Sequence, residues 1–268
     1  MTAARRWPGD NASATKIPNR SDLDRSALLG HPFVVRLKSY VDLTNADIDA
    51  IARSIERTLV VPKKNSVVLE GYQCATVHLV KQGFGIRYKV LPNGKRQILN
   101  VVLPGDVIGL PGALFNRALY TVASMTVMTL HTMSLDAFTQ MARATPNVLL
   151  AMMWLAEHDL TMIGDHLIGI GRLTPLERVA NFIFEMWIRL HSVGHAVGNS
   201  IELPISQHVI GDALGLSAPH VNRMLRRLKD LGLIAITQGS LFIKDAEELQ
   251  LLGRYKSHVP ARISFSRL

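Results

Sequence analysis

The chain has 268 residues, 48% of them hydrophobic, which excludes general disorder and suffices for two domains with a sizeable core. Its formal net charge of +9 favours a polyanionic partner such as nucleic acid. The single cysteine excludes an internal disulfide framework, and neither a long apolar run nor a signal peptide is present, so we expect a cytoplasmic protein without a membrane segment.

The N-terminal part is predicted to be a flexible tail followed by a short helix. Residues 1–27 are polar and contain prolines and a glycine, which is typical of a tail. From about Thr44 to Thr58, isoleucines recur at helical spacing, and Thr44 is placed to cap the helix.

Short strands are expected from about Ser66 to Ser134. Around residues 86–90, apolar and basic side chains alternate, as they do in a half-buried strand. The turn residues Pro92, Asn93 and Gly94 then indicate a hairpin, with residues 97–103 as the returning strand. Many short strands punctuated by glycines predict a β-sandwich or jelly roll.

A long helix is predicted to begin near Pro146 and to end at about Ile170. Its apolar residues are spaced alternately by four and three, which is a heptad seam typical of paired helices. The predicted dimer-interface residues are Leu149, Met153, Ala156, Leu160, Ile163, Leu167 and Ile170. A second line, including Val148 and Met152, is expected to pack on the strand-rich domain. The alternative is one buried helix within a single chain. Gly169 and Gly171 are expected to end the helix at a hinge that extends to Thr174.

The segment Ile205 to Ile234 predicts a helix-turn-helix. Ser206 can cap a first helix, Gly215 allows the tight turn, and Ser217 can cap a second helix that has Pro219 in its first turn. Val221, Leu225 and Leu228 of the second helix recur at helical spacing and are expected to face inward. The ordinary alternative is a helical hairpin with solvated arginines.

The polar and basic face of this second helix is suited to a DNA major groove. A wing should follow, with strands near Leu233–Thr237 and Leu241–Ile243 joined by a turn at Gln238, Gly239 and Ser240. The predicted DNA-binding residues are Ser206, Gln207, Ser217, Ala218, Pro219, His220, Asn222, Arg223, Arg226, Gln238 and Ser240.

The order of these parts resembles the Crp/Fnr family, the cyclic-AMP receptor and fumarate–nitrate-reductase regulators of bacteria. VHLVKQGFGIRYKVLPNGKRQILNVVLPGDVIG (residues 77–109) matches the family's strand, turn and G-D-x-x-G pattern, and LTPLERVANF (173–182) with the helix-turn-helix matches its DNA-binding part. The resemblance covers roughly Val67 to Leu252.

The resemblance implies an α+β fold in five parts. These are a flexible tail (1–27), an N-terminal β jelly-roll sensor domain like a cyclic-nucleotide-binding domain (28–145), a dimerisation helix (146–171), a C-terminal winged helix-turn-helix domain (172–252) and a C-terminal tail (253–268). It further implies a transcription regulator that binds a palindromic operator as a homodimer and contacts RNA polymerase.

The family's base-reading positions carry over one by one. The arginine that contacts a guanine matches Arg223. In the family, a glutamate usually lies four residues before this arginine and reads a cytosine. Pro219 replaces it here, so this readout is lost. Asn222 is placed to read an adenine, and His220 is a third candidate. The half-site should therefore differ from those of the best-known members.

The effector site departs from the cyclic-nucleotide pattern. Leu110 stands at the place of the ribose-binding glutamate. The place of the phosphate-binding arginine is taken by Tyr120 or, with a shifted alignment, by Val122. Arg117 is the only nearby guanidinium, and Thr121 alone survives. The candidate pocket residues are Ile108, Leu110, Tyr120 and Thr121. We therefore expect an unidentified small-molecule effector other than cyclic AMP, or none.

Other cofactors have little support in the sequence. One cysteine cannot supply the four thiolates of an iron–sulfur cluster. Two alternatives remain open for Cys74: a redox-sensitive thiol, or haem ligation together with His78 on one face of a strand. The histidines, including His158 and His166, show no metal-ligand spacing, so we expect no metal site.

No catalytic motif is present, and we expect no enzyme. Two other functions of the winged helix remain hypotheses: nonspecific binding of nucleic acid, and interaction with another protein.

Overall fold

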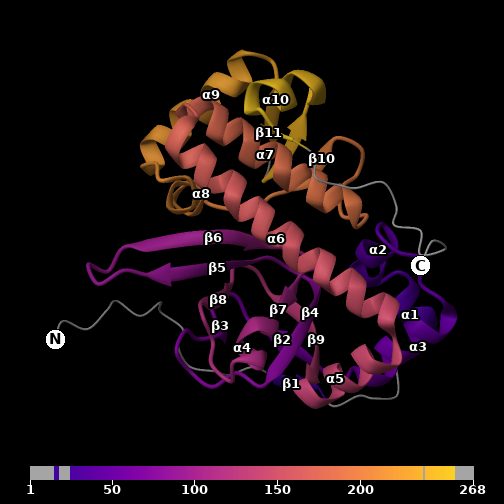
Figure 1. Ribbon diagram of the computed structural model, residues 1–268. Helices are drawn as coiled ribbons and strands as arrows, with labels where there is room; N and C mark the ends of the chain where they lie inside the picture. The colour runs from indigo at the N-terminus through magenta and orange to yellow at the C-terminus, as the bar shows by residue number, and fades with distance from the viewer. Residues whose placement is uncertain (1–14, 18–24, 238, 257–268) are drawn as a thin grey trace.

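The computed structural model describes residues 15–17, 25–237 and 239–256, and it confirms the expected α+β fold (Figure 1). A strand-rich β-roll domain comes first, a single long helix runs across the molecule, and a winged-helix domain follows. Within the described residues, no helix combines the length and the hydropathy needed to cross a bilayer.

Two antiparallel sheets form the β-roll domain. One sheet has the order β1-β2-β9-β4-β7 and the other β3-β8-β5-β6. The strands are β1 (Thr15–Ile17), β2 (Arg57–Val61), β3 (Ser66–Val68), β4 (Thr76–Gln82), β5 (Gly85–Val90), β6 (Arg96–Val102), β7 (Val107–Ile108), β8 (Thr121–Ser124) and β9 (Met128–Ser134). Buried aliphatic side chains from both sheets, such as Val80 and Leu130 from one and Val102 and Val122 from the other, form a common core. This is the sandwich that the alternating pattern predicted.

Helices cover the outer side of the first sheet. They are α1 (Arg25–Leu29), α2 (Pro32–Lys38), α3 (Asn45–Ser54), α4 (Leu110–Leu114) and α5 (Leu135–Ala144). Thr44 caps α3 in a reciprocal capping box with Asp47, as its position in the sequence suggested. The buried face of α3 joins a second core that also contains Phe33 and Leu37 of α2.

The N-terminal expectations need correction. The predicted helix stops at Ser54 rather than Thr58, because residues 57–61 form β2 and pair with β9. Part of the predicted tail is also ordered, since residues 15–17 pair with β2 and α1 begins at Arg25. A run of three residues is too short for its pairing to be visible in the local sequence. The rest of the predicted tail lies outside the described residues.

The long helix α6 (Pro146–Arg172) begins where it was predicted, but it does not end at the glycines. The backbone N–H of Leu173 bonds to the carbonyl of Gly169 at 3.0 Å, so the helical hydrogen-bond ladder continues past Gly169 and Gly171. The link to the next helix is therefore residues 173–174. Val148, Met152 and Leu155 are buried against the β-roll domain, as the second apolar line predicted.

The winged-helix domain packs around one core. Its elements are α7 (Pro175–Ser192), β10 (Ser200–Glu202), α8 (Gln207–Leu214), α9 (Ala218–Asp230), β11 (Ile234–Thr237), β12 (Ser240–Ile243) and α10 (Ala246–Gly253). The ring of Tyr255 lies 5.1 Å from that of Phe184 and packs on this core, so the domain extends past the predicted start of the C-terminal tail at residue 253. The remainder of that tail, from residue 257, lies outside the described residues.

A buried ionic network fastens the two domains of one chain together. Asp106, in the turn after β6, forms ion pairs with Arg36 of α2 and with Arg189 of α7, the latter at 2.8 Å. Arg189 also donates to the carbonyl of Val101 and pairs with Glu185, which His166 of α6 contacts at 2.5 Å. Helices α2, α6 and α7 and the turn after β6 therefore meet at one junction in which the buried charges compensate one another.

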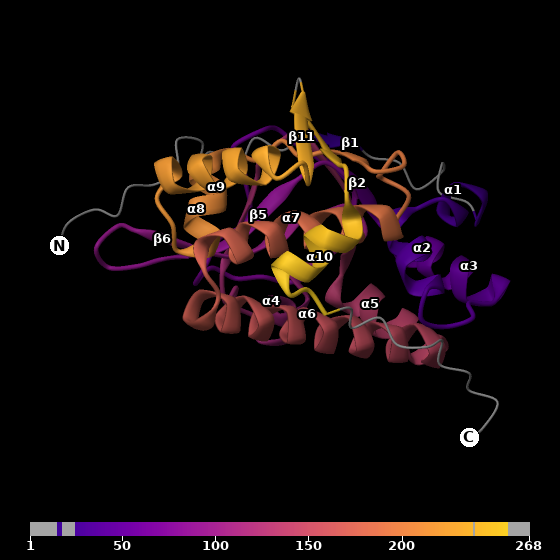
Figure 2. The same cartoon turned by 90° about the horizontal axis from the view of Figure 1, so that it is seen from above.

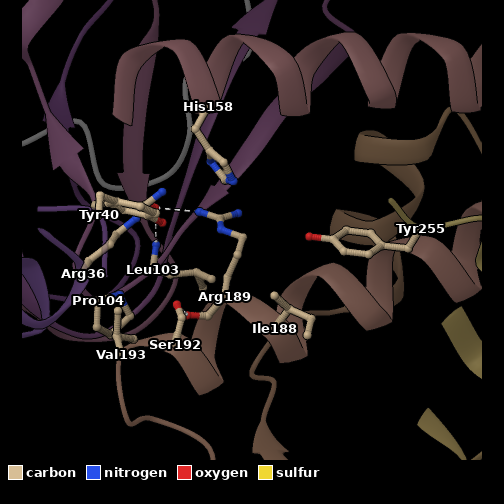
Figure 3. A pocket seen from close by; sticks show the side chains of 11 residues that line it. Arg36, Tyr40, Leu103, Pro104, His158, Ile188, Arg189, Ser192, Val193 and Tyr255 are labelled. Atoms are coloured by element: carbon tan, nitrogen blue, oxygen red, sulfur yellow. Dashed lines mark hydrogen bonds and ion pairs between the residues drawn. The ribbon is translucent and has the colours of Figure 1, made fainter. Parts of the chain in front are cut away.

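The charges at this junction stabilise one another. Burial alone would raise the pKa of Asp106 and Glu185, but the adjacent cations lower both, and that of Glu185 lies at about 2. Beside the network lies a cavity of about 30 Å³, into which the hydroxyl of Tyr255 and the ring of His158 point (Figure 3). That volume holds about one water molecule, so the cavity is no effector site.

Candidate nucleic-acid interface

The first helix of the helix-turn-helix, α8, begins and ends at the predicted residues. The Ser206 hydroxyl accepts a hydrogen bond from the backbone N–H of Val209 at 3.3 Å. Gly215 follows the helix with a φ of 67°, the left-handed conformation that glycine adopts without steric strain. Both residues were identified from the sequence, because capping and turn chemistry are local.

A second glycine, Gly211, was missed, and it allows the turn to pass close to α8. A Cβ built on Gly211 would lie 2.4 Å from the carbonyl oxygen of Leu216, well inside contact distance. Only a residue without a side chain fits this crossing. The signal is a glycine inside an otherwise helical pattern, four residues before the turn glycine.

We therefore expect Gly211→Ala to destabilise the winged-helix domain. The clash with Leu216 must be relieved by a backbone shift, at a cost of about 1–3 kcal/mol. Urea unfolding followed by circular dichroism measures the effect. Gly30→Ala is the matched control, because a Cβ there meets nothing within 4 Å. Equal unfolding free energies for the two variants would contradict the assignment.

Arg178 of α7 is a further positioning residue that the sequence analysis did not single out. Its guanidinium donates to the carbonyl of Leu214 at 3.1 Å and to that of Leu173 at 2.9 Å. It thus joins the end of α8 to the link between α6 and α7. Nothing local in the sequence distinguishes it from a solvated arginine.

The recognition helix α9 has the two faces predicted for it. Val221, Leu225 and Leu228 are buried in the domain core. The Ser217 hydroxyl accepts from the backbone N–H of His220, and Pro219 lies in the first turn, where it removes no helical hydrogen bond. The helix is therefore held from its inner side and presents its other side to solvent.

The outward face of α9 carries the predicted DNA-binding residues. Pro219, Arg223 and Arg226 are exposed, and Ala218, His220 and Asn222 are partly exposed. Within the described residues, Arg223 and Arg226 form no hydrogen bond or ion pair with another side chain. Ser206 and Ser217 are exposed at the two helix N-termini, and Gln207 is partly exposed beside Ser206. Backbone N–H groups at such termini can bind phosphate.

The predicted wing is present as a hairpin. Strand β11 pairs with β12 in antiparallel register, with Thr237 opposite Ser240, and Gly239 has a φ of 87°. Ser240 is partly exposed, whereas Gln238 lies outside the described residues. Seen from above, the wing and α9 lie along the side of the molecule opposite α6 (Figure 2).

The predicted seam of α6 is exposed. Leu160 is 61% exposed and Leu167 72% exposed, which is unusual for large apolar side chains unless another surface covers them. Every residue of the predicted seam is exposed, namely Leu149, Met153, Ala156, Leu160, Ile163, Leu167 and Ile170. Because the opposite face of α6 is buried against its own chain, the seam is an apolar stripe that the other described residues leave exposed. The helix that carries it lies along one edge of the protein (Figure 2).

The four candidate effector residues lie in different surroundings within the β-roll domain. Ile108 is fully buried in the core between the sheets, and Leu110 packs on the other core beneath the helices. The Thr121 hydroxyl accepts from the backbone N–H of Glu70 at 3.1 Å. The Tyr120 hydroxyl is buried and has no hydrogen-bond partner among the described residues.

The cation nearest to Tyr120 is Arg87 of β5, not Arg117 as the sequence suggested. The Arg87 guanidinium carbon lies 4.6 Å from the centre of the Tyr120 ring, and one of its nitrogens lies 3.7 Å from Asp159 of α6. Arg117 instead lies beside Gly71. The chain thus places a buried arginine from a different strand in this part of the β-roll, and a carboxylate of α6 already faces it.

Cys74 and His78 do not fit a haem site. Cys74 precedes β4 rather than sharing a strand face with His78, and its thiol lies 3.6 Å from the carbonyl oxygen of Gly109. Both ring nitrogens of His78 are occupied, by the hydroxyls of Thr76 at 3.2 Å and Thr132 at 2.9 Å. The burial of Cys74 also differs from the exposed position typical of redox-sensor thiols. Within the described residues, no cluster of three or more metal-ligating side chains occurs.

Three buried histidines are expected to make the β-roll domain sensitive to acid. Burial lowers the pKa of His31 to about 3 and those of His78 and His131 to about 4, so the folded domain keeps these imidazoles neutral. An unfolded histidine titrates near 6.5. Below that pH the unfolded chain binds more protons than the folded one, and the free energy of unfolding falls until the folded pKa values are reached.

The expected result is a loss of stability as the pH falls from about 6.5 to about 4. Three such groups give a slope of up to about 4 kcal/mol per pH unit. Chemical denaturation at a series of pH values measures this slope. His131→Leu should remove the contribution of one of the three histidines to it. Stability that is flat across this range would contradict the burial of neutral imidazoles.

Comparisons with known proteins agree with this arrangement. Residues 58–145 match the cyclic nucleotide-binding domain family, and residues 177–252 match the Crp-like helix-turn-helix domain family. The nitrogen fixation regulation protein FixK of Bradyrhizobium diazoefficiens is 31% identical over 173 residues, which cover 65% of this chain and 72% of that protein. The chain belongs to the Crp/Fnr family.

Other Crp/Fnr proteins are similar over much of the chain. The transcriptional activatory protein AadR of Rhodopseudomonas palustris is 28% identical over 79% of this chain and 87% of that protein. The solved structure of FixK2 from Bradyrhizobium japonicum has a TM-score of 0.67 at 27% identity, covering 75% of this chain and 98% of that one. The chain is therefore a Crp/Fnr-type transcriptional regulator with a cyclic-nucleotide-binding-like domain and a helix-turn-helix domain, in a family whose members are not enzymes.

Proposed function

We propose that this Crp/Fnr regulator reads a palindromic operator as a homodimer, with α9 of each chain in the major groove. The observation that carries the proposal is the outward face of α9, where Arg223 and Arg226 are exposed and form no hydrogen bond or ion pair with another side chain of the described residues. An arginine that is not held by a carboxylate is available to the edge of a guanine or to a phosphate. Asn222 and His220 stand beside Arg223 for neighbouring base pairs.

The exposed seam of α6 supports pairing of two copies. Its side chains recur every three or four residues along the helix, which matches the spacing of a left-handed helix pair. A second α6 is the complementary surface of the same length and pattern. Two-fold pairing also supplies the two recognition helices that an inverted repeat requires.

The proposed regulator does not use cyclic AMP. Leu110 and Tyr120 replace the carboxylate and the guanidinium that would hold the ribose and the phosphate, and each lost charge-assisted bond removes about 1.5–3 kcal/mol. Arg87 is nearby, but Asp159 lies 3.7 Å from it. The effector is therefore a different small molecule, or none. Mass spectrometry of gently purified protein distinguishes these two cases, and binding of cyclic AMP at micromolar concentration in calorimetry would contradict the proposal.

A regulator of this kind acts on the bacterial chromosome, in the cytoplasm, and we include RNA polymerase among its partners. Selection from random DNA duplexes by the full-length protein tests the reading of sequence. An enriched inverted repeat supports the proposal. Enrichment of no sequence, with affinity that still depends on salt, indicates a nonspecific nucleic-acid-binding protein. No affinity for DNA indicates a protein-interaction module. Either result overturns the proposal.

A further inference from the structure

The hairpin formed by β5 and β6 lies against α8 of the same chain (Figure 1). We propose that Arg96 of this hairpin is a positioning residue, which through Asp212 of α8 sets the separation of the two half-sites that the dimer accepts. This inference rests on the proposed function, because it concerns the spacing rather than the reading of the half-sites.

The polar part of the contact joins three groups. The Arg96 guanidinium donates from Nε at 3.0 Å and from Nη2 at 2.5 Å to the same carboxylate oxygen of Asp212. Next to it, the side-chain amide of Gln97 donates to the carbonyl of Ala213 at 3.3 Å. Two donors on one oxygen hold the guanidinium in one orientation, and the ion pair is only partly exposed.

An apolar cluster continues the contact along α8. Val209 of α8 is buried among Ile86, Tyr88 and Ile98 of the hairpin. The Arg96 guanidinium carbon also lies 5.4 Å from the centre of the Tyr88 ring, so the ion pair and the apolar cluster are continuous. The hairpin thus supports α8 along its side and at its carboxyl-terminal end.

The hairpin contact is not the only connection between the domains. The buried network at Asp106 and Arg189 lies at the opposite end of β6, near the end of α7. Apolar side chains of both domains, including Val101 of β6 and Phe182 of α7, also pack in one core. Contacts at both ends of β6, together with this core, favour one orientation of the winged-helix domain relative to the β-roll domain and to α6.

The docked orientation is compatible with DNA binding. The hairpin contacts α8 through Val209, Asp212 and Ala213, whereas Arg223 on the outward face of α9 is exposed. Because α6 also carries the seam, docking relates the recognition helix to the two-fold axis of the proposed dimer. A domain held in place before binding loses less freedom when both half-sites are occupied, which favours one spacing.

The experiment measures affinity for a series of duplexes that differ only in half-site separation. Two selected half-sites are moved apart one base pair at a time around about 10 base pairs, and a single half-site duplex is included. The proteins are the full-length wild type, Arg96→Ala, Asp212→Ala and the charge-swapped double variant Arg96→Asp with Asp212→Arg. Lys95→Ala is the matched control, because Lys95 is an exposed neighbour on the same hairpin turn.

We expect one preferred separation for the wild type and for Lys95→Ala. Arg96→Ala and Asp212→Ala should bind that duplex about five- to tenfold more weakly, should accept neighbouring separations almost equally well, and should bind the single half-site as the wild type does. The double variant should recover the preference. Thermal unfolding confirms that the single variants are folded.

Two results would overturn the inference. One is a separation profile of Arg96→Ala that matches the wild type, and the other is a higher affinity of Arg96→Ala at every separation, which means that the contact opposes DNA binding. A wild type that binds all separations and the single half-site equally well instead overturns the proposed function. The two failures are therefore distinguishable.

Discussion

Arg223→Ala is expected to weaken operator binding by about 1–3 kcal/mol for each half-site, which is roughly 5- to 150-fold per half-site at room temperature. The side chain is exposed on the outward face of α9 and forms no ion pair within the described residues, so its removal leaves no buried charge unpaired. The loss should be base-specific: replacing the contacted base pair should weaken the wild type and leave the variant almost unaffected. Fluorescence anisotropy with the selected duplex measures both effects.

Lys229→Ala is the control for Arg223→Ala. Lys229 is also exposed on α9 but lies in its last turn, far from the end that enters the groove. Its removal should weaken binding to all sequences by about the same factor, and that factor should be smaller than the effect of Arg223→Ala on the operator. It should also reduce the salt dependence of binding. An Arg223→Ala protein with wild-type affinity and unchanged base preference would show that another residue reads the sequence.

Leu160→Asp is expected to split the proposed dimer. Leu160 is 61% exposed in one chain, and burial of a leucine side chain against a partner contributes about 1.5–3 kcal/mol. The two-fold axis doubles the loss to about 3–6 kcal/mol, and two facing carboxylates add repulsion. The dissociation constant of the dimer should therefore rise at least about a hundredfold. Light scattering over a concentration series measures the mass, and Ile163→Asp should act in the same way.

Ile168→Asp is the matched control for the seam. Ile168 also lies on α6 and is 60% exposed, but it falls outside the spacing of the predicted interface. The variant should remain dimeric. The account of the seam would be wrong if both variants had the mass of the wild type, or if both were monomers.

The sequence was informative wherever structure depends on neighbouring residues. Ser206, Gly215 and Ser217 could be assigned because caps and turns act within a few positions. The two faces of α6 could be separated because heptad spacing distinguishes them, and the exposed seam and buried second line follow that separation. The same reasoning predicted the hairpin at residues 91–95 and the wing.

The sequence could not show contacts between distant segments. In the ionic network, Asp106 pairs with Arg36, 70 positions away, and with Arg189, 83 positions away. From the neighbouring sequence alone, each of these residues would be interpreted as a solvated charge. Arg87 reaches Tyr120 from another strand, so a search near Tyr120 in the sequence found Arg117 instead. The need for a glycine at position 211 arises because Leu216 passes close to α8, and the local sequence does not show this approach.

The helix end at Arg172 shows a different limit. Gly169 and Gly171 are separated by one residue, and each glycine costs about 1 kcal/mol in a helix interior because glycine is a poor helix former. The tertiary structure overrides this preference, since Leu173 still bonds to the carbonyl of Gly169. The glycines predicted a helix end near Ile170, whereas α6 continues to Arg172. The link at residues 173–174 lies within the hinge expected from Gly169 to Thr174.

The central claim is that two chains, paired along α6, insert two recognition helices into one operator. Sedimentation velocity of the wild-type protein with a labelled duplex of the selected sequence tests it most directly, because it counts chains on the DNA. We predict two chains on each duplex that carries both half-sites, and much weaker binding to a duplex that carries one. A single chain bound with full affinity to either duplex would contradict the account.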